Sequence, residues 1–234
     1  MSNSKLVDLV YKSPNYNKRK GKISKITVHH TAGVVSAKTL GEIFAPKSRE
    51  ASCNYGIGSD GKVVLIVDEA NRSWCSSNAA NDHVAVTIEV SNSVNDDRWL
   101  VDDKVLAKLI DLCVDICKRN GIKKLNFTGN KNGNLTLHNF FANTNCPGPY
   151  LESKIPYIVK EVNKRLGAVE KEFVPYIVRV TANALNIRDG AGTGYKINGV
   201  IADKGVYTIV EVKDNWGKLK SGLGWICLDY TKKI

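Results

Sequence analysis

The chain has 234 residues, of which 43% are hydrophobic, so it is long enough for two average domains with real cores and is not a disordered chain. Its formal net charge of +11 predicts attraction to polyanions such as nucleic acid, anionic lipid or acidic wall polymers, without choosing among them. No apolar run approaches the roughly 20 residues of a membrane span, and MSNSKLVDLV lacks the layout of a secretory signal, so we expect cytoplasmic synthesis and no membrane insertion.

The first segment, residues 1–166, alternates strand-like and helical patterns. The runs ISKITVHHT, CNYGIGSDGKVVLIV and VAVTIEVSN have strand character. Residues 101–120 then carry apolar side chains at helical spacing, with Asp102 or Asp103 as the N-cap and an Asn-Gly pair as the stop, and a last helix is predicted over residues 149–166. The alternation predicts an α/β domain with a mixed central sheet and flanking helices.

The last part of the chain changes character. Residues 167–174 are short and charged, which predicts a linker. From residue 175 to 234, β-rich runs of about five residues alternate with turns that contain Gly or Asp, and this spacing is typical of a small all-β barrel or sandwich. This segment has nine basic and five acidic residues, and its formal charge of +4 favours an anionic partner.

Cysteine usage depends on the compartment. In the reducing cytoplasm expected for this chain, its six cysteines are more often free thiols or metal ligands than disulfides, so we predict no disulfide. Cys113 and Cys117 lie four residues apart on the apolar face of the predicted helix, which favours core packing for both.

Two adjacent histidines end the first long predicted strand, and neighbouring strand residues face opposite sides of a sheet. His30 shares its side with Ile26 and Val28, which favours a packed role. His29 shares its side with Thr27 and is freer to act as a ligand. From the strand alone, a structural role for either histidine is the more common outcome.

A second histidine and a cysteine lie eight residues apart in LTLHNFFANTNCPGPYL. The proline after Cys146 holds that residue extended, and a helix is expected to begin within three residues. The positive end of the helix dipole favours the thiolate that zinc requires, so His138 and Cys146 are candidate zinc ligands. The alternative is a buried cysteine beside a turn.

Taken together, TVHHTAG, CNYGIGSDGKV, VAVTIEVSN and LHNFFANTNCPGPYL resemble the N-acetylmuramoyl-L-alanine amidases that share the fold of peptidoglycan-recognition proteins and phage-lysozyme amidases (amidase type 2). The resemblance covers roughly residues 20–166. It implies that His29, His138 and Cys146 bind one Zn²⁺ and leave an open position for water. It also implies hydrolysis of the amide between N-acetylmuramic acid and L-alanine of peptidoglycan.

The resemblance implies roles for two further residues. Glu89 corresponds to a strand glutamate of the family and is the candidate proton shuttle; we expect burial to raise its pKa, the alternative being an edge-strand acid in solvent. Thr144 precedes the cysteine ligand by two residues, where its hydroxyl could donate to the developing oxyanion, although a threonine in a loop is more often a turn residue.

One position departs from the family. Some members carry a catalytic tyrosine where this chain has Cys53. Tyr55, two residues on and therefore expected on the same strand face, either stands in for it or lines the substrate groove. His83 is favoured as a surface or structural histidine over a substrate contact, and the basic cluster at residues 15–25 as a solvated segment over a phosphate-binding one.

The segment from residue 175 onward resembles the bacterial SH3-like domains of wall hydrolases, which implies a wall-binding module. Its tryptophans and tyrosines supply aromatic surface and core, and no single one of them is predicted to contact a ligand. A catalytic domain joined to such a module, without a secretory signal, resembles a phage or prophage endolysin that reaches the wall after release. A bacterial autolysin exported by another route is the alternative.

Three other functions are open from the sequence. A non-catalytic peptidoglycan-binding protein would be expected to have lost a zinc ligand, and the presence of Cys146 argues against it. A thiol hydrolase would use Cys146 as nucleophile and His138 as base. A basic nucleic-acid binder would bind DNA tightly and with strong salt dependence, and we expect no such binding.

Overall fold

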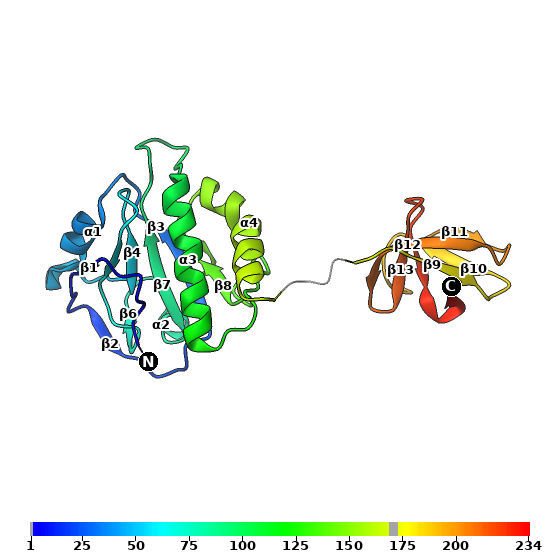
Figure 1. The fold of residues 1–234 in the computed structure, drawn as a ribbon, viewed down its shortest axis with the longest axis horizontal. Helices are drawn as coiled ribbons and strands as arrows, with labels where there is room; N and C mark the ends of the chain where they lie inside the picture. Colours follow the sequence, from blue (N-terminus) through cyan, green and yellow to red (C-terminus); the bar gives the residue numbers. More distant parts are fainter. Residues whose placement is uncertain (1, 169–172) are drawn as a thin grey trace. The chain divides into compact units, whose positions relative to one another are not determined.

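The computed structural model of the chain describes residues 2–168 and 173–234. The chain divides into two compact units, Met1–Val169 and Glu170–Ile234, and each has its own hydrophobic core (Figure 1). Of the predicted linker at 167–174, residues 169–172 lie outside the described residues. No helix in the described part of the chain combines the length and the apolar character needed to cross a membrane.

The first unit is built on a six-stranded mixed sheet with the order β1-β5-β4-β7-β3-β8. The four strands β4, β7, β3 and β8 are parallel to one another, and β5 is antiparallel to β4. The prediction of an α/β domain with a mixed central sheet is therefore confirmed. The bounds of the six strands are β1 Leu9–Val10, β3 Lys25–His30, β4 Tyr55–Ile57, β5 Val63–Leu65, β7 Ala85–Val90 and β8 Leu135–Leu137.

Helices cover both faces of this sheet (Figure 1). The helices α3 (Asp103–Asn120) and α4 (Pro149–Arg165) pack together on one face, and α1 (Ala37–Phe44) packs against β4 and β5 on the other. The N-cap of α3 is Asp102, whose carboxylate accepts the backbone N–H of Lys104, as its position in the sequence predicts. The two long helices thus begin and end within one residue of their predicted bounds.

Alternation along the central strands separates an apolar face from a polar one. Ile26 and Val28 of β3, and Ile88 of β7, belong to the core beneath α3 and α4. His29, which follows Val28, and Glu89, which follows Ile88, point to the opposite face, where Glu89 and residues of α1 line one cavity. Functional side chains are therefore placed on the α1 face by the same periodicity that builds the core on the other face.

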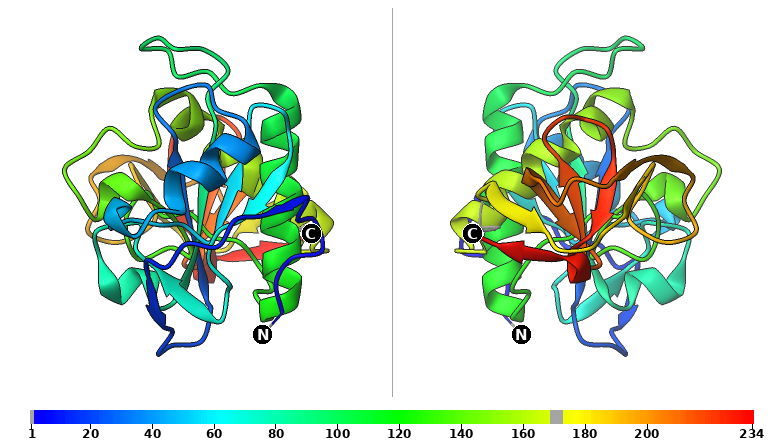
Figure 2. Two further views of the ribbon diagram at one scale, coloured as in Figure 1. Left: turned by 90° about the vertical axis from the view of Figure 1, so that its left-hand side faces the viewer. Right: turned by 90° about the vertical axis from the view of Figure 1, so that its right-hand side faces the viewer.

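The first unit also contains several shorter elements. They are the two-stranded sheet of β2 (Tyr16–Lys18) and β6 (Asn71–Ser73), the helix α2 (Ala79–Asp82), and the 3₁₀ helices Lys47–Arg49 and His138–Phe140. The loop between β7 and α3 projects beyond the rest of the unit in both views of Figure 2.

The second unit is a seven-stranded antiparallel sheet with the order β11-β10-β14-β13-β12-β9-β15. Its core is small and aliphatic, and includes Val178, Ile209 and Ile226. Six of the strands coincide with the β-rich runs of the sequence, so the prediction of an all-β segment is confirmed. The strand bounds are β9 Tyr176–Val180, β10 Leu185–Arg188, β11 Ile197–Ile201, β12 Val206–Lys213, β13 Trp216–Leu219, β14 Trp225–Cys227 and β15 Thr231–Lys233.

Candidate active site

The candidate site lies at the edge of the sheet where the parallel strands end. His29 is the penultimate residue of β3 and pairs in register with Glu89 of β7. His138 follows β8 directly, and β8 is parallel to β3. Since the carboxyl ends of adjacent parallel strands meet at one edge, residues far apart in the sequence come together there, which is where ligands bind in open α/β sheets.

His29, His138 and Cys146 form one compact cluster. Their potential ligand atoms all lie within 4.8 Å of one another, and the two imidazole rings have centroids 4.5 Å apart. Nε2 of His29 and Nε2 of His138 are buried and have no hydrogen-bond partner. Because leaving a buried polar atom unpaired costs about 1–3 kcal/mol, these nitrogens are suited to hold a metal ion. Two imidazoles and a thiol fit the donor set of zinc.

Burial sets the protonation states in this cluster. It lowers the pKa of His29 well below the ordinary value, with smaller contributions from His138 and His30, and it also lowers the pKa of His138. Both rings are therefore neutral at physiological pH, which is the form that binds a metal.

The thiol of Cys146 behaves differently from the expectation based on the helix dipole. Burial raises the pKa of this thiol well above its ordinary range, and the negative charge of Glu89 adds to the increase, although the backbone N–H of His30 donates to Sγ at 3.3 Å. Desolvation thus outweighs the dipole, and only a bound cation would make the thiolate the stable form.

Glu89 lies on the wall of a cavity of about 290 Å³ beside this cluster. Its strand, β7, is hydrogen-bonded to β4 on one side and β3 on the other, so the alternative of a solvated edge-strand acid does not hold. Burial raises the pKa of Glu89 to about 8, against the opposing effect of the positive charge on Arg49. Its Oε2 is buried and unpaired.

A second grouping overlaps the first. The ligand atoms of His29, Cys75 and Glu89 also lie within 4.8 Å of one another, and Cys75 Sγ is 4.0 Å from Glu89 Oε1. The sequence did not point to Cys75, because it follows β6 in a loop with no recognisable spacing to the other candidates.

Thr144 lies on the wall of the same cavity. Its Oγ1 accepts the backbone N–H of Cys146 at 3.2 Å, which fixes the oxygen and leaves the hydroxyl proton available for a ligand in the cavity. Residues of α1 and of the 3₁₀ helix after it form the opposite wall. The sequence did not predict a role for these two helices in the site. The residues contributed by these two helices are Leu40, Ile43, Phe44 and Arg49.

Tyr55 does not belong to this site, contrary to the prediction that it replaces the family tyrosine or lines the groove. Its side chain is fully buried in the core beneath α3, where the hydroxyl donates to Glu69 Oε1 at 2.7 Å and accepts the N–H of Ser4 at 2.8 Å. Cys53 packs on the α1 side instead. The two side chains are on different faces because β4 begins only at Tyr55 and the chain bends just before it.

The other two histidines have separate environments. His30 stacks on Trp99 with ring centroids 4.1 Å apart, and its Nδ1 accepts the N–H of Ala32 at 2.7 Å, as a packed role requires. His83 precedes β7, at the opposite end of that strand from Glu89, and its Nδ1 accepts the N–H of Lys20. That position is far from the metal-ligand cluster.

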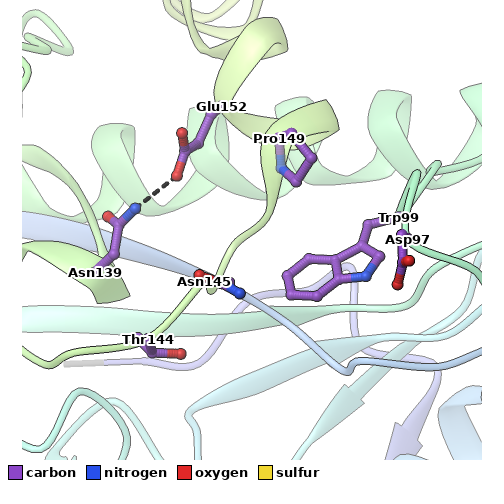
Figure 3. A pocket seen from close by; sticks show the side chains of 7 residues that line it. All are labelled: Asp97, Trp99, Asn139, Thr144, Asn145, Pro149 and Glu152. Atoms are coloured by element: carbon purple, nitrogen blue, oxygen red, sulfur yellow. Dashed lines mark hydrogen bonds between the residues drawn. The ribbon is translucent and has the colours of Figure 1, made fainter.

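A second cavity has a volume of about 490 Å³, and Figure 3 shows the side chains that line it. It shares Thr144 with the first cavity. It lies between the loop that precedes α3 and the segment that leads into α4. Its walls carry aromatic, amide and acidic side chains: Asp97, Trp99, Asn139, Thr144, Asn145, Pro149 and Glu152. The two cavities are therefore neighbours near the carboxyl edge of the sheet.

The first unit is thus an α/β fold whose His-His-Cys cluster, with Glu89 beside it, could hold a metal ion. The family model described as N-acetylmuramoyl-L-alanine amidase matches residues 19–149, a range that contains all the site residues of this cluster, and the chain belongs to this family. It is an amidase of bacterial peptidoglycan, acting on the bond between N-acetylmuramic acid and L-alanine.

Solved structures support the fold. PlyL has a TM-score of 0.52 at 15% identity, over 66% of this chain and 95% of PlyL. A selenomethionine derivative of AmpD has a TM-score of 0.54 at 17% identity, over 67% of this chain and 96% of the other. The PlyG catalytic domain has a TM-score of 0.53 at 16% identity, over 70% of this chain and 99% of the PlyG domain. The sequence matches none of the curated proteins.

Proposed function

We propose that the chain is a zinc-dependent N-acetylmuramoyl-L-alanine amidase whose metal ligands are His29, His138 and Cys146. The observation that supports it best is the pair of buried, unpartnered imidazole nitrogens within 4.8 Å of a thiol. Zinc held by such ligands lowers the pKa of water to about 7 and polarises the scissile carbonyl.

Glu89 is proposed to move the proton. With a pKa of about 8 the carboxyl is mostly protonated at neutral pH, and the positive charge of a metal would lower this pKa toward neutrality, where the group can both accept and donate. The carboxylate first accepts the proton of the water and then donates it to the nitrogen of L-alanine. Its position on a central strand, in register with His29, supports this role.

Thr144 is proposed to stabilise the developing oxyanion. Its oxygen is fixed by the N–H of Cys146, so its hydroxyl proton is directed without the cost of ordering a free side chain. Apolar side chains on the cavity wall, among them Ile43 and Phe44, would limit the access of bulk water to the bond.

The second unit is proposed to be an SH3-like module that binds the cell wall. The formal charge of +4 on residues 175–234 favours an anionic wall polymer, and several aromatic side chains, among them Tyr195 and Tyr230, are exposed. Together with the amidase unit, this favours an endolysin of phage or prophage origin that is made in the cytoplasm and lyses the wall after release.

The thiol-hydrolase alternative is disfavoured by electrostatics. A cysteine nucleophile needs a lowered pKa, usually from a nearby cation, whereas burial raises the pKa of the Cys146 thiol. The non-catalytic alternative is disfavoured because no ligand of the proposed set is missing from the sequence.

A chelation experiment tests the proposal. Treatment with phenanthroline is expected to abolish peptidoglycan hydrolysis and added zinc to restore it, while His29→Ala, His138→Ala and Cys146→Ala are each expected to lose both bound zinc and activity. Cys227→Ala, which changes a cysteine in the other unit, serves as the matched control and should keep both. Activity that survives complete removal of the metal would refute the zinc mechanism and favour the thiol one.

A further inference from the structure

We propose that Cys75 and Glu89, beside His29, form a second metal site that fills when divalent metal is in excess, and that filling it stops turnover. The ligand atoms of these three side chains lie within 4.8 Å of one another. We call this group the second site, and keep the name metal-ligand cluster for His29, His138 and Cys146. The inference rests on the proposed function, because it places a second ion beside the zinc that the amidase would use.

The donor atoms of the second site suit zinc and related ions. Zinc binds imidazole nitrogen, thiolate sulfur and carboxylate oxygen, and this group offers one of each. Nε2 of His29 and Oε2 of Glu89 are both buried and have no hydrogen-bond partner. Cys75 Sγ is 4.0 Å from Glu89 Oε1, a long distance for a hydrogen bond even from sulfur, so the thiol only partly satisfies the carboxylate. A bound dication would satisfy both the thiol and the carboxylate.

The fold holds the backbone of all three residues in place. His29 and Glu89 are paired in register on the neighbouring parallel strands β3 and β7. Cys75 lies in the loop after β6, where the buried carboxylate of Asp82 accepts its N–H at 3.1 Å and the N–H of Ser76 at 3.2 Å. The hydroxyl of Ser76 donates to the same carboxylate. A loop that is ordered before the ion arrives lowers the entropic cost of binding it.

His29 belongs to both ligand groups, and this makes the second ion the weaker of the two. On the proposed function, the first zinc binds Nε2 of His29, and this nitrogen has a single lone pair. A second ion then has only Cys75 and Glu89 as ligands of its own, with water in its remaining positions. Two protein ligands hold an ion less tightly than three, so the second site fills only when metal is in excess.

Negative charge at the second site offsets the repulsion between two dications. A pair of such ions brings four positive charges, against three negative charges from the thiolates of Cys146 and Cys75 and the carboxylate of Glu89. The net charge is then the same as that of a single zinc with the Cys146 thiolate. Several classes of hydrolase hold two metal ions roughly 3.5–4 Å apart, so the closeness of the two ligand groups does not prevent double occupancy.

An ion at the second site would stop proton transfer. Glu89 is the proposed proton carrier, and a carboxylate that binds a metal ion is no longer free to accept a proton from water or to donate one to the leaving nitrogen. Because general acid–base catalysis contributes about 10²–10⁴-fold to a rate, saturation of the second site is expected to lower kcat at least about 100-fold.

A zinc titration of the full chain tests the inhibition. Zinc is added to chelated protein, and hydrolysis of a soluble muramyl peptide is measured at each addition. The activity of the wild type is expected to rise up to one equivalent and to fall when zinc is in excess. The activity of Cys75→Ser, relative to its own maximum, is expected to rise in the same way and then to stay level, because the second ion has lost its thiolate.

A cobalt titration tests the site without any substrate. A thiolate bound to Co²⁺ gives a charge-transfer absorption in the near ultraviolet, and each of the two ion positions includes one thiolate. The absorption of the wild type is therefore expected to increase in two steps, for Cys146 and then for Cys75. Cys75→Ser and Glu89→Gln are each expected to show the first step and to lack the second.

Cys53→Ser is the matched control, because Cys53 is another buried thiol of the same unit and, among the described residues, belongs to neither ligand group. It should show both cobalt steps and the inhibition by excess zinc. A single cobalt step in the wild type, or the same response of wild type and Cys75→Ser to excess zinc, would overturn the second site and leave the amidase function intact. Two cobalt steps in a wild type that hydrolyses no peptidoglycan would support the second site while the amidase function fails.

Discussion

Glu89 and Cys146 are both acids made weaker by burial; Cys146 belongs to the proposed metal-ligand cluster, and Glu89 lies beside it. Each has a raised pKa because desolvation penalises its charged form, and the negative charge of Glu89 further disfavours the thiolate of Cys146. A dication held by the cluster would reverse both effects. The ionisation of both groups would therefore depend on the binding of the proposed metal.

Substitution of Glu89 should separate metal binding from turnover. Glu89→Gln keeps the size of the side chain and removes the group that moves the proton, so zinc content is expected to stay at the wild-type level while kcat falls about 10²–10⁴-fold. Elemental analysis and single-turnover kinetics on the same sample measure the two effects. Normal lysis by this variant would show that another group carries the proton.

The raised pKa of Glu89 also predicts how stability depends on pH in the metal-free protein. The carboxyl has a pKa of about 8 in the folded state against 4.5 as the reference value, so the folded state holds its proton more tightly. The stability that this provides is fully present below pH 4.5 and is lost as the pH rises toward 8. Urea unfolding of chelated protein should therefore show the wild type losing stability relative to Glu89→Gln across this range. Parallel pH profiles for the two proteins would contradict the pKa shift.

At the scale of elements, Tyr55 connects three parts of the first unit. Its hydroxyl joins β4 to Ser4 in the N-terminal segment and to Glu69, which in turn pairs with Arg119 of α3 at 2.6 Å. Glu69 is fully buried, so this network contributes to the stability of the fold and not to the chemistry of the site.

Tyr55→Phe should therefore affect stability and leave catalysis intact. The variant leaves the buried N–H of Ser4 without its acceptor, which is expected to cost about 1–3 kcal/mol of the free energy of unfolding. The kcat and zinc content of the folded protein should not change. A loss of kcat of more than about tenfold in folded protein would show that Tyr55 contributes to catalysis.

Local sequence patterns predicted the helices and strands of this chain well. They did not predict all the residues that surround the site. The caps and apolar spacing of α3 and the proline that begins α4 are local signals, and both helices have nearly their predicted bounds. Tyr55 was predicted to share a strand face with Cys53. This prediction was wrong because the chain bends at Asn54, so the alternation of a regular strand does not extend across that residue. Arg49 and Cys75 were missed because they reach the site from loops and short helices, whose placement depends on tertiary packing.

At the scale of the whole molecule, the two units have separate cores and different compositions of secondary structure. The proposed division of labour assigns bond cleavage to the first and wall attachment to the second. Attachment raises the local concentration of a catalytic unit on a polymer without changing the chemistry at the bond.

Removal of residues 173–234 should separate these two tasks. The truncated protein is expected to hydrolyse a soluble muramyl peptide at close to the wild-type rate and to lyse intact walls much more slowly. Turbidity of a wall suspension and chromatography of the soluble product measure the two activities. Equal lysis by the full and truncated chains would contradict the wall-binding role.

A metal held by His29, His138 and Cys146 is proposed to assist the cleavage of one amide, the bond between N-acetylmuramic acid and L-alanine. Mass spectrometry of peptidoglycan digested by protein of known zinc content tests it most directly. One zinc per chain is predicted, with products that end in intact muramic acid on the glycan side and in a free L-alanine amino group on the peptide side. Active protein that contains no metal, or products cut at a glycosidic or internal peptide bond, would contradict the account.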